Sequence, residues 1–143
     1  MLVIKAHLIS EYYLNQLIAL EDINFQKLNY PGKIDRTTSA ESTLNIVLYA
    51  LNKLRNKIGH ELDYALSESD IDGLGYKLYS KKEYVIKKYD TEDKMDLLRA
   101  ILVSIIIKLS VQVEIKIKQI KNEMGTEKKV VSTASPTPSA VTP

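Results

Sequence analysis

The chain contains no cysteine, no tryptophan and only two histidines among its 143 residues. Without cysteine it can form neither a disulfide framework nor a cysteine-ligated zinc site, and it is compatible with a reducing compartment. His7 and His60 are too few for a multi-histidine metal site within one chain. The sequence therefore predicts no metal site and no cofactor.

Long apolar runs are also missing. The most hydrophobic run, residues 100–107, ends at Lys108 and is too short to span a bilayer. The N-terminal stretch lacks the basic start, continuous apolar centre and small-residue cleavage site of a signal peptide. We therefore expect a soluble protein that acts in the cytoplasm and has no membrane partner.

A strong excess of charge of one sign is absent as well. The 20 lysines and arginines nearly balance the 18 acidic residues, and the formal net charge of +2 does not by itself indicate a nucleic-acid binder. The apolar fraction of 45% and the charged fraction of 27% are ordinary for a globular protein. A chain of this length can bury one core, so we expect one folded domain.

Three stretches carry apolar residues at the spacing of an amphipathic helix: residues 2–21, 40–62 and 91–124. Residues 111–118 also alternate apolar and polar side chains as a strand would. Because no second long strand is available to pair with them, we predict a helix there. The predicted fold is therefore all-α, an up-and-down bundle of four to five helices with residues 40–62 at its centre.

Capping residues mark the predicted helix ends. Thr38 or Ser39 is placed to cap the central helix, and Asp90 or Thr91 the last one, because their side chains accept hydrogen bonds from free N–H groups. Gly125 is placed as a C-cap. This predicts a domain over residues 1–124 and a disordered tail rich in Ser, Thr and Pro over residues 125–143.

The connections between these helices are predicted to be mostly irregular. Residues 23–30 fit a short helix that Pro31-Gly32 ends, and residues 33–39 a polar loop. Residues 67–73 are predicted to form an acidic turn that lacks the ligand pattern of a calcium loop. Residues 75–89 interleave tyrosines with lysines, which fits a solvated connector or an RNA-stacking surface. We favour the connector.

The most informative stretch is residues 51–62, near the end of the central helix. Asn52, Asn56 and His60 recur every four residues, so they share one helical face. Arg55 precedes His60 by about 140° of rotation and about 7.5 Å along the axis. Its long side chain can still reach toward the imidazole, or the two residues can line one cleft from neighbouring faces.

An arginine and a histidine without acidic metal ligands suit metal-independent cleavage of RNA. Histidine titrates near neutrality and can take the proton of the attacking 2′-OH or protonate the leaving oxygen, while arginine stabilises the charge on phosphorus. Asn52 and Asn56 are candidates to orient the substrate or fix the imidazole tautomer, and Lys53 and Lys57 to bind RNA. The same spacing also occurs on solvated helix faces. Spacing alone leaves both interpretations open.

Residues 51–60, LNKLRNKIGH, resemble the signature of the HEPN superfamily of small all-helical bundles. Its motif is an arginine, a polar residue, a few variable residues and a histidine. Residues 7–14 resemble first helices of bacterial members, so the likeness covers roughly residues 1–123. The resemblance assigns Arg55 and His60 as the catalytic pair and Asn56 as the polar residue.

The resemblance also implies a homodimer with a composite cleft, endoribonuclease activity on RNA without a metal, and a role in toxin–antitoxin or anti-phage defence. A further implied partner is an antitoxin or another protein of a neighbouring gene. Leu62 stands where members paired with a nucleotidyltransferase often have tyrosine, and Tyr64 is not equivalent to it.

Two alternatives remain at this point. The first is a catalytically silent module that binds RNA or a protein, and the second is a regulatory protein whose last helix docks a partner. We expect His7 to be a partly buried helix residue, with Glu11 near the cleft only if the first helix flanks the central one.

Overall fold

The computed structural model describes residues 1–61 and 63–134, and these residues form an all-α structure, as predicted. Six α-helices and one short 3-10 helix are present in this part of the chain, more than the four or five helices predicted. In chain order they are α1 (Leu2–Ala19), η1 (Phe25–Lys27), α2 (Tyr30–Thr37), α3 (Thr43–His60), α4 (Glu68–Leu78), α5 (Lys81–Asp90) and α6 (Lys94–Ala134).

Helix α2 replaces the loop that was predicted after Pro31, and of the short helix predicted over residues 23–30 only the 3-10 helix η1 is present. The side chain of Asn29 caps α2 by accepting a hydrogen bond from the Gly32 N–H at 2.9 Å. Pro31 fits the first turn because no intrahelical hydrogen bond is required of its nitrogen there. The Pro-Gly pair therefore belongs to the start of a helix, not to the end of one.

Helix α3 was predicted correctly as the long central helix, but its cap is Ser42 and not Thr38 or Ser39. The Ser42 hydroxyl accepts a hydrogen bond from the Asn45 N–H at 3.1 Å. Thr38 instead follows the last turn of α2, as its C-cap. The helix continues without a break to His60.

Helices α4 and α5 occupy the segments predicted as an acidic turn and a connector, so both predictions are wrong. Ser67 and Asp70 form a reciprocal capping box at the start of α4. Ser80 caps α5 by accepting a hydrogen bond from the Glu83 N–H. Both helices thus start at a Ser-x-x-acid pattern, and Tyr84 of α5 is fully buried.

Helix α6 has 41 residues, so it is about 61 Å long. The strand alternative is wrong, because Val113 is buried while Val111 and Ile115 are exposed. Asp93 accepts a hydrogen bond from the Met95 N–H at 2.9 Å at the start of α6, so Asp90 and Thr91 do not cap it. The helix passes through Gly125, which was predicted to end it. Of the predicted disordered tail, residues 135–143 lie outside the described residues.

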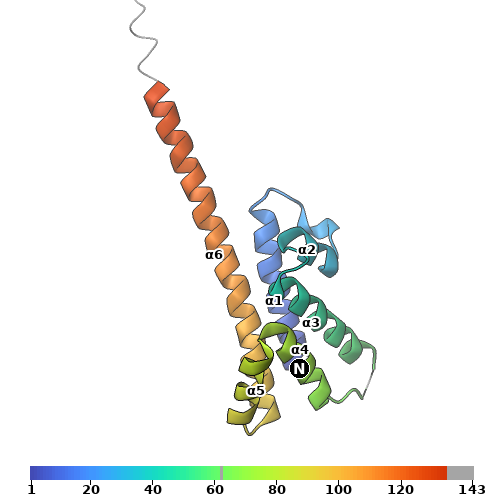
Figure 1. Cartoon of the computed structure of the whole chain (residues 1–143). Coiled ribbons are helices and arrows are strands. Elements are labelled where there is room, and N and C mark those ends of the chain that lie inside the picture. Colours follow the sequence, from blue (N-terminus) through green and yellow to red (C-terminus); the bar gives the residue numbers. More distant parts are fainter. Residues whose placement is uncertain (62, 135–143) are drawn as a thin grey trace, which may run out of the picture.

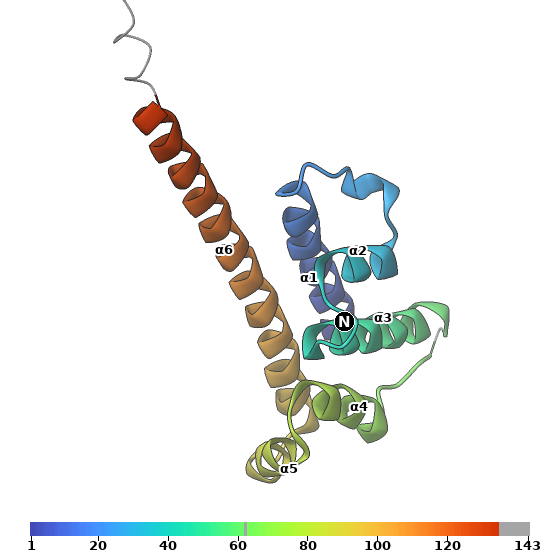
Figure 2. The same cartoon turned by 45° about the horizontal axis from the view of Figure 1, so that its top comes forward.

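The helices are arranged around α3. Helix α6 lies beside α1, runs in the same direction and continues past the rest of the structure (Figure 1). Figure 2 shows α3 with α1 and α2 on one side and α4 on the other. The core is apolar, and its fully buried members include Leu14, Leu48, Leu51, Ile71, Leu98, Ile101 and Ile105. No helix in residues 1–61 and 63–134 combines the length and apolarity needed to cross a membrane.

We expect Gly75→Ala to destabilise the fold, because a Cβ at Gly75 would overlap the buried Tyr84 ring. Overpacking of this kind costs about 1–3 kcal/mol. Gly73→Ala on the same helix is the matched control, since a Cβ there meets nothing within 4 Å. It should stabilise α4 by up to about 1 kcal/mol. Urea denaturation measures both free energies of unfolding, and equal stability of the two variants would contradict the packing argument.

Candidate functional site

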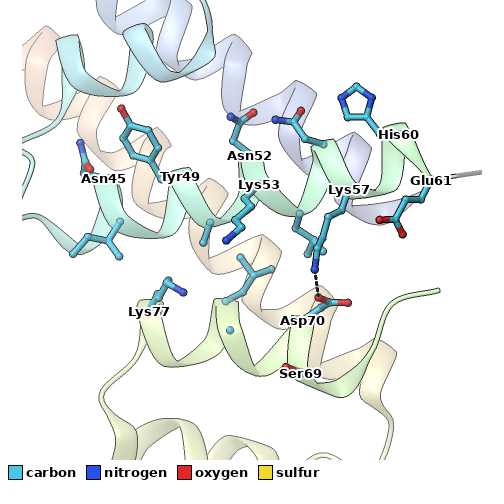
Figure 3. Close-up of a pocket in the computed structure, with 16 residues that line it drawn as sticks. Asn45, Tyr49, Asn52, Lys53, Lys57, His60, Glu61, Ser69, Asp70 and Lys77 are labelled. Atoms are coloured by element: carbon cyan, nitrogen blue, oxygen red, sulfur yellow. Dashed lines mark ion pairs between the residues drawn. The ribbon is translucent and has the colours of Figure 1, made fainter. Parts of the chain in front are cut away.

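A cleft of about 940 Å³ lies between α3 and α4 and is lined by part of the motif on α3 (Figure 3). Asn52, Asn56 and His60 all line it, so the structure brings together the three residues that were expected to share a face. The other lining residues are Asn45, Ile46, Tyr49, Ala50, Lys53, Leu54, Lys57 and Glu61 of α3 and its C-cap, and Ser69, Asp70, Gly73, Leu74 and Lys77 of α4.

His60 is the last residue of α3 and its side chain is exposed. This position at a helix end leaves the imidazole accessible from the cleft, where the substrate of a proton-transfer reaction would have to lie. Among the described residues the cleft contains no other histidine.

Arg55 is not among the residues that line the cleft. One guanidinium nitrogen, Nη1, lies 3.5 Å from the Asn56 Oδ1, and the same nitrogen would lie 3.4 Å from a Cβ placed at Gly59. The guanidinium therefore lies against the backbone at Gly59, one turn along the same helix. A Cβ at Gly59 would meet the guanidinium only in ordinary van der Waals contact.

Lys53 and Lys57 both line the cleft, as an RNA-binding role requires. Lys57 lies 3.9 Å from the Asp70 Oδ1 of α4, whereas no ion pair involves Lys53 within the described residues. Burial opposes ionisation of Asp70, but hydrogen bonds from Tyr64 and Ser67 outweigh it and lower the pKa of this carboxyl. The lysines of α5 do not converge on the cleft.

Tyr64 contributes to the fold next to the cleft. Its hydroxyl donates a hydrogen bond to Asp70, which raises the pKa of Tyr64 to about 12. Lys57 also lies 5.6 Å from the centre of the Tyr64 ring. Tyr64 therefore ties the segment after α3 to the start of α4.

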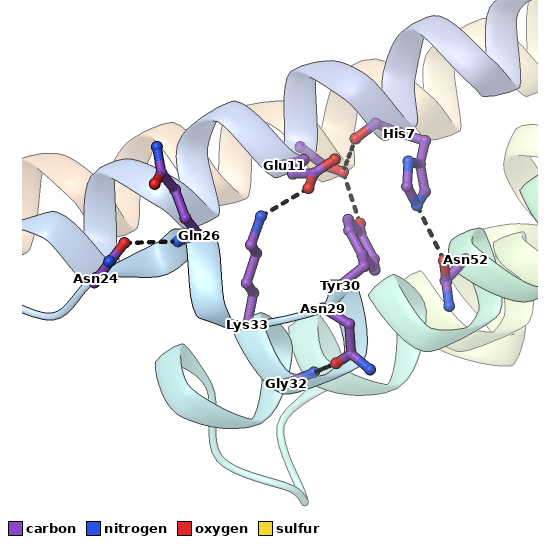
Figure 4. Close-up of polar contacts among 10 residues, drawn as sticks. His7, Glu11, Asn24, Gln26, Asn29, Tyr30, Gly32, Lys33 and Asn52 are labelled. Atoms are coloured by element: carbon purple, nitrogen blue, oxygen red, sulfur yellow. Dashed lines mark hydrogen bonds and ion pairs between the residues drawn. The ribbon is translucent and has the colours of Figure 1, made fainter.

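His7 lies on α1 next to Asn52 and is buried more deeply than the partly buried helix residue that was expected (Figure 4). Its Nε2 donates a hydrogen bond to the Asn52 Oδ1 at 3.0 Å, and its ring stacks on Tyr30 with centroids 4.0 Å apart. Burial is the largest cause that lowers the pKa of His7, and the charge of Arg55 lowers it further. Asn52 thus contacts the imidazole of His7.

Glu11 does not line the cleft, although it is on the same helix as His7. Its Oε1 accepts a hydrogen bond from the buried Lys33 of α2 at 2.7 Å. This contact, together with the hydrogen bond between Ser10 and Tyr30 at 2.7 Å, joins α1 to α2. Glu11 therefore helps to hold α2 against α1, the helix that carries His7.

Within the described residues, no cluster of three or more His, Cys, Asp or Glu side chains is placed to hold a metal ion. No family model matches this chain, and no curated protein and no solved structure matches it. The HEPN resemblance and the roles of the site residues accordingly remain predictions.

We expect the free energy of unfolding to fall as the pH drops below about 6.5, in part because His7 is buried as the neutral imidazole. Since the folded-state pKa of His7 is lowered, the unfolded chain binds a proton at a higher pH than the folded chain does. The free energy of unfolding therefore falls by up to about 1.4 kcal/mol for each pH unit below that point. His7→Gln retains an amide donor for Asn52 and cannot titrate. Urea denaturation between pH 7 and pH 5 should show a shallower pH dependence for this variant, and an unchanged dependence would contradict the assignment.

Proposed function

We propose that this protein is a metal-independent endoribonuclease of the HEPN type that acts as a homodimer. The observation that carries the proposal is an exposed His60 at the end of a cleft whose other polar side chains include Asn52, Asn56 and two lysines of α3. Amides and lysines suit a phosphodiester with hydroxyl groups, and the histidine suits transfer of its protons.

In the proposed reaction, the imidazole of His60 accepts the proton of a ribose 2′-OH, whose oxygen attacks the adjacent phosphorus. The bond from phosphorus to the 5′-oxygen breaks, and that oxygen takes up a proton. The products carry a 2′,3′-cyclic phosphate and a 5′-hydroxyl. Arg55 stabilises the negative charge that develops on the phosphate oxygens. Its guanidinium lies at Gly59, next to His60, so a rotation of its long side chain can bring it to the cleft.

The proposed reaction needs one group that accepts a proton and another that donates one. His7 does not supply the second group, because it is buried and its Nε2 hydrogen is used by Asn52. A second copy of the chain supplies a second His60, and two-fold symmetric dimers are the commonest assemblies. This supports a composite site made by two copies of the end of α3.

The biological role follows from the resemblance. We propose a place in a toxin–antitoxin or anti-phage defence system in the cytoplasm, with RNA as the substrate. An antitoxin or another protein encoded nearby would be the second partner.

One observation favours the alternative of a catalytically silent module that binds RNA or a protein. Arg55 does not line the cleft, and its guanidinium contacts its own helix. A cleft with His60 and lysines but without the arginine would still bind a phosphate backbone.

Cleavage of labelled RNA in excess EDTA tests the proposal. Wild-type protein should give products with 2′,3′-cyclic phosphate ends. His60→Ala should lower kcat/KM by about 100- to 10,000-fold, because it removes the proton-transfer group. Arg55→Ala should lower kcat with a smaller change in KM, since the guanidinium acts on the charge of the transition state.

Lys82→Ala on α5 is the control, as its side chain is exposed and is not part of the lining of the cleft. Intact RNA with all four proteins would overturn the ribonuclease proposal. Retention of RNA without cleavage would then select the silent module.

A further inference from the structure

The cleft extends well beyond His60. Tyr49, Lys53, Asn56 and His60 follow one another at steps of four, three and four residues, so they lie on one face of α3. All four line the cleft. The distance along the helix from Tyr49 to His60 is about 16 Å. A stacked strand carries one phosphate per about 3.4 Å, so this face is long enough for a few nucleotides.

Charge is distributed unevenly along the cleft. Glu61 and Asp70 lie at the end that contains His60, where Lys57 is paired with Asp70 (Figure 3). Lys53 of α3 and Lys77 of α4 lie farther along, and Figure 3 shows their side chains pointing toward one another across the cleft. No ion pair involves either lysine within residues 1–61 and 63–134. A single anionic group between them would be attracted by both cations.

Beyond these lysines the lining of the cleft includes Tyr49, whose ring projects from α3 on the side away from α4 (Figure 3). Tyr49 is 37% exposed, and its hydroxyl donates a hydrogen bond to the Asp35 carboxylate of α2 at 2.7 Å, which holds the ring in place. Bases stack on fixed aromatic rings of this kind only when they are not paired in a duplex. Between the polar groups, Ile46, Ala50 and Leu74 provide an apolar lining for such a base.

We propose that single-stranded RNA lies along α3 from His60 to Tyr49, with a phosphate between Lys53 and Lys77 and a base stacked on Tyr49. The identity of the ligand as RNA rests on the proposed function, whereas the position of the strand rests on the geometry of the cleft. The chain would therefore select unpaired RNA by contacts at a distance from the bond that is cut.

Fluorescence anisotropy with a labelled, unstructured RNA tests this proposal in a His60→Ala background, so binding is measured whether or not the wild type cleaves. Lys53→Gln/Lys77→Gln should reduce the slope of log K against log salt by about 0.7, because the charge that neutralises one phosphate of the single strand is lost. Lys81→Gln/Lys82→Gln removes the same charge from α5, outside the cleft, and should leave the slope unchanged.

Tyr49→Ala should weaken binding about 5- to 150-fold, the usual loss for one stacked base. Tyr49→Phe keeps the ring but not the hydrogen bond to Asp35, so it should lose less affinity than Tyr49→Ala, which separates stacking from that bond. Tyr89→Ala is the control, since Tyr89 is 89% exposed on α5. Circular dichroism and thermal melting establish that each variant is folded.

Three results would overturn the proposal: equal losses of RNA affinity in the cleft variants and the control variants, a duplex bound as tightly as the single strand, or no binding of RNA. Binding that depends on Lys53, Lys77 and Tyr49 supports it even if the wild type leaves RNA intact, in which case only the ribonuclease proposal fails. Cleavage of RNA that does not depend on these three residues would support the ribonuclease proposal and contradict the proposed position of the strand.

Discussion

The rotation of α3 about its own axis decides which side chains reach the cleft, and a row of buried leucines sets that rotation. Leu48 and Leu51 are fully buried and Leu54 nearly so. Full burial of each such side chain is worth about 1.5–3 kcal/mol, so exposing all three by turning α3 would cost about 4.5–9 kcal/mol, which is comparable to the whole stability of a small domain. The hydrogen bond between His7 and Asn52 adds a directional contact on the side of α1. Lys53 and Lys57 are therefore held toward α4, whereas Asn52 and His60 project from α3 away from α4 (Figure 3).

The same constraint accounts for the separation of Arg55 from His60. A continuous helix places residues five apart on different faces, and α3 remains regular through His60. With Leu51 and Leu54 in the core, His60 faces the cleft and Arg55 faces the side where its charge lowers the pKa of His7. On that side the guanidinium lies along the helix beside Gly59. The spacing of the motif thus requires a movement of Arg55, or a second copy, before both groups reach one phosphate.

The sequence predicts the long helices well because each has a continuous apolar stripe that buries a large face. It predicts the short ones poorly. Helix α2 was missed because Pro31-Gly32 was interpreted without the capping residue Asn29 that precedes it. Helices α4 and α5 carry few apolar residues, and the space that Gly75 leaves for Tyr84 is a contact between two helices that no local pattern reveals. The Ser-x-x-acid patterns at their starts were the available signal.

The candidate site also has a part that the sequence predicts and a part that it does not. That Asn52, Asn56 and His60 share a face follows from their spacing alone, and the structure places all three in one cleft. The contribution of α4 depends on how two helices pack, so Asp70 and Lys77 had no signal in the sequence. The buried state of His7 depends equally on Tyr30 and Asn52, which come from two other helices.

The two ends of the cleft have different roles in the proposals, and this limits where a second copy of the chain can bind. The proposed reaction needs a second His60, so the two-fold axis must pass near the end of α3, where His60 and Glu61 are exposed. The proposed strand needs the opposite end open, because Lys53, Lys77 and Tyr49 must remain accessible there. Both requirements are met only if the dimer contact is confined to the end of α3 and the segment after it. Two strand-binding faces would then lead away from one shared pair of histidines.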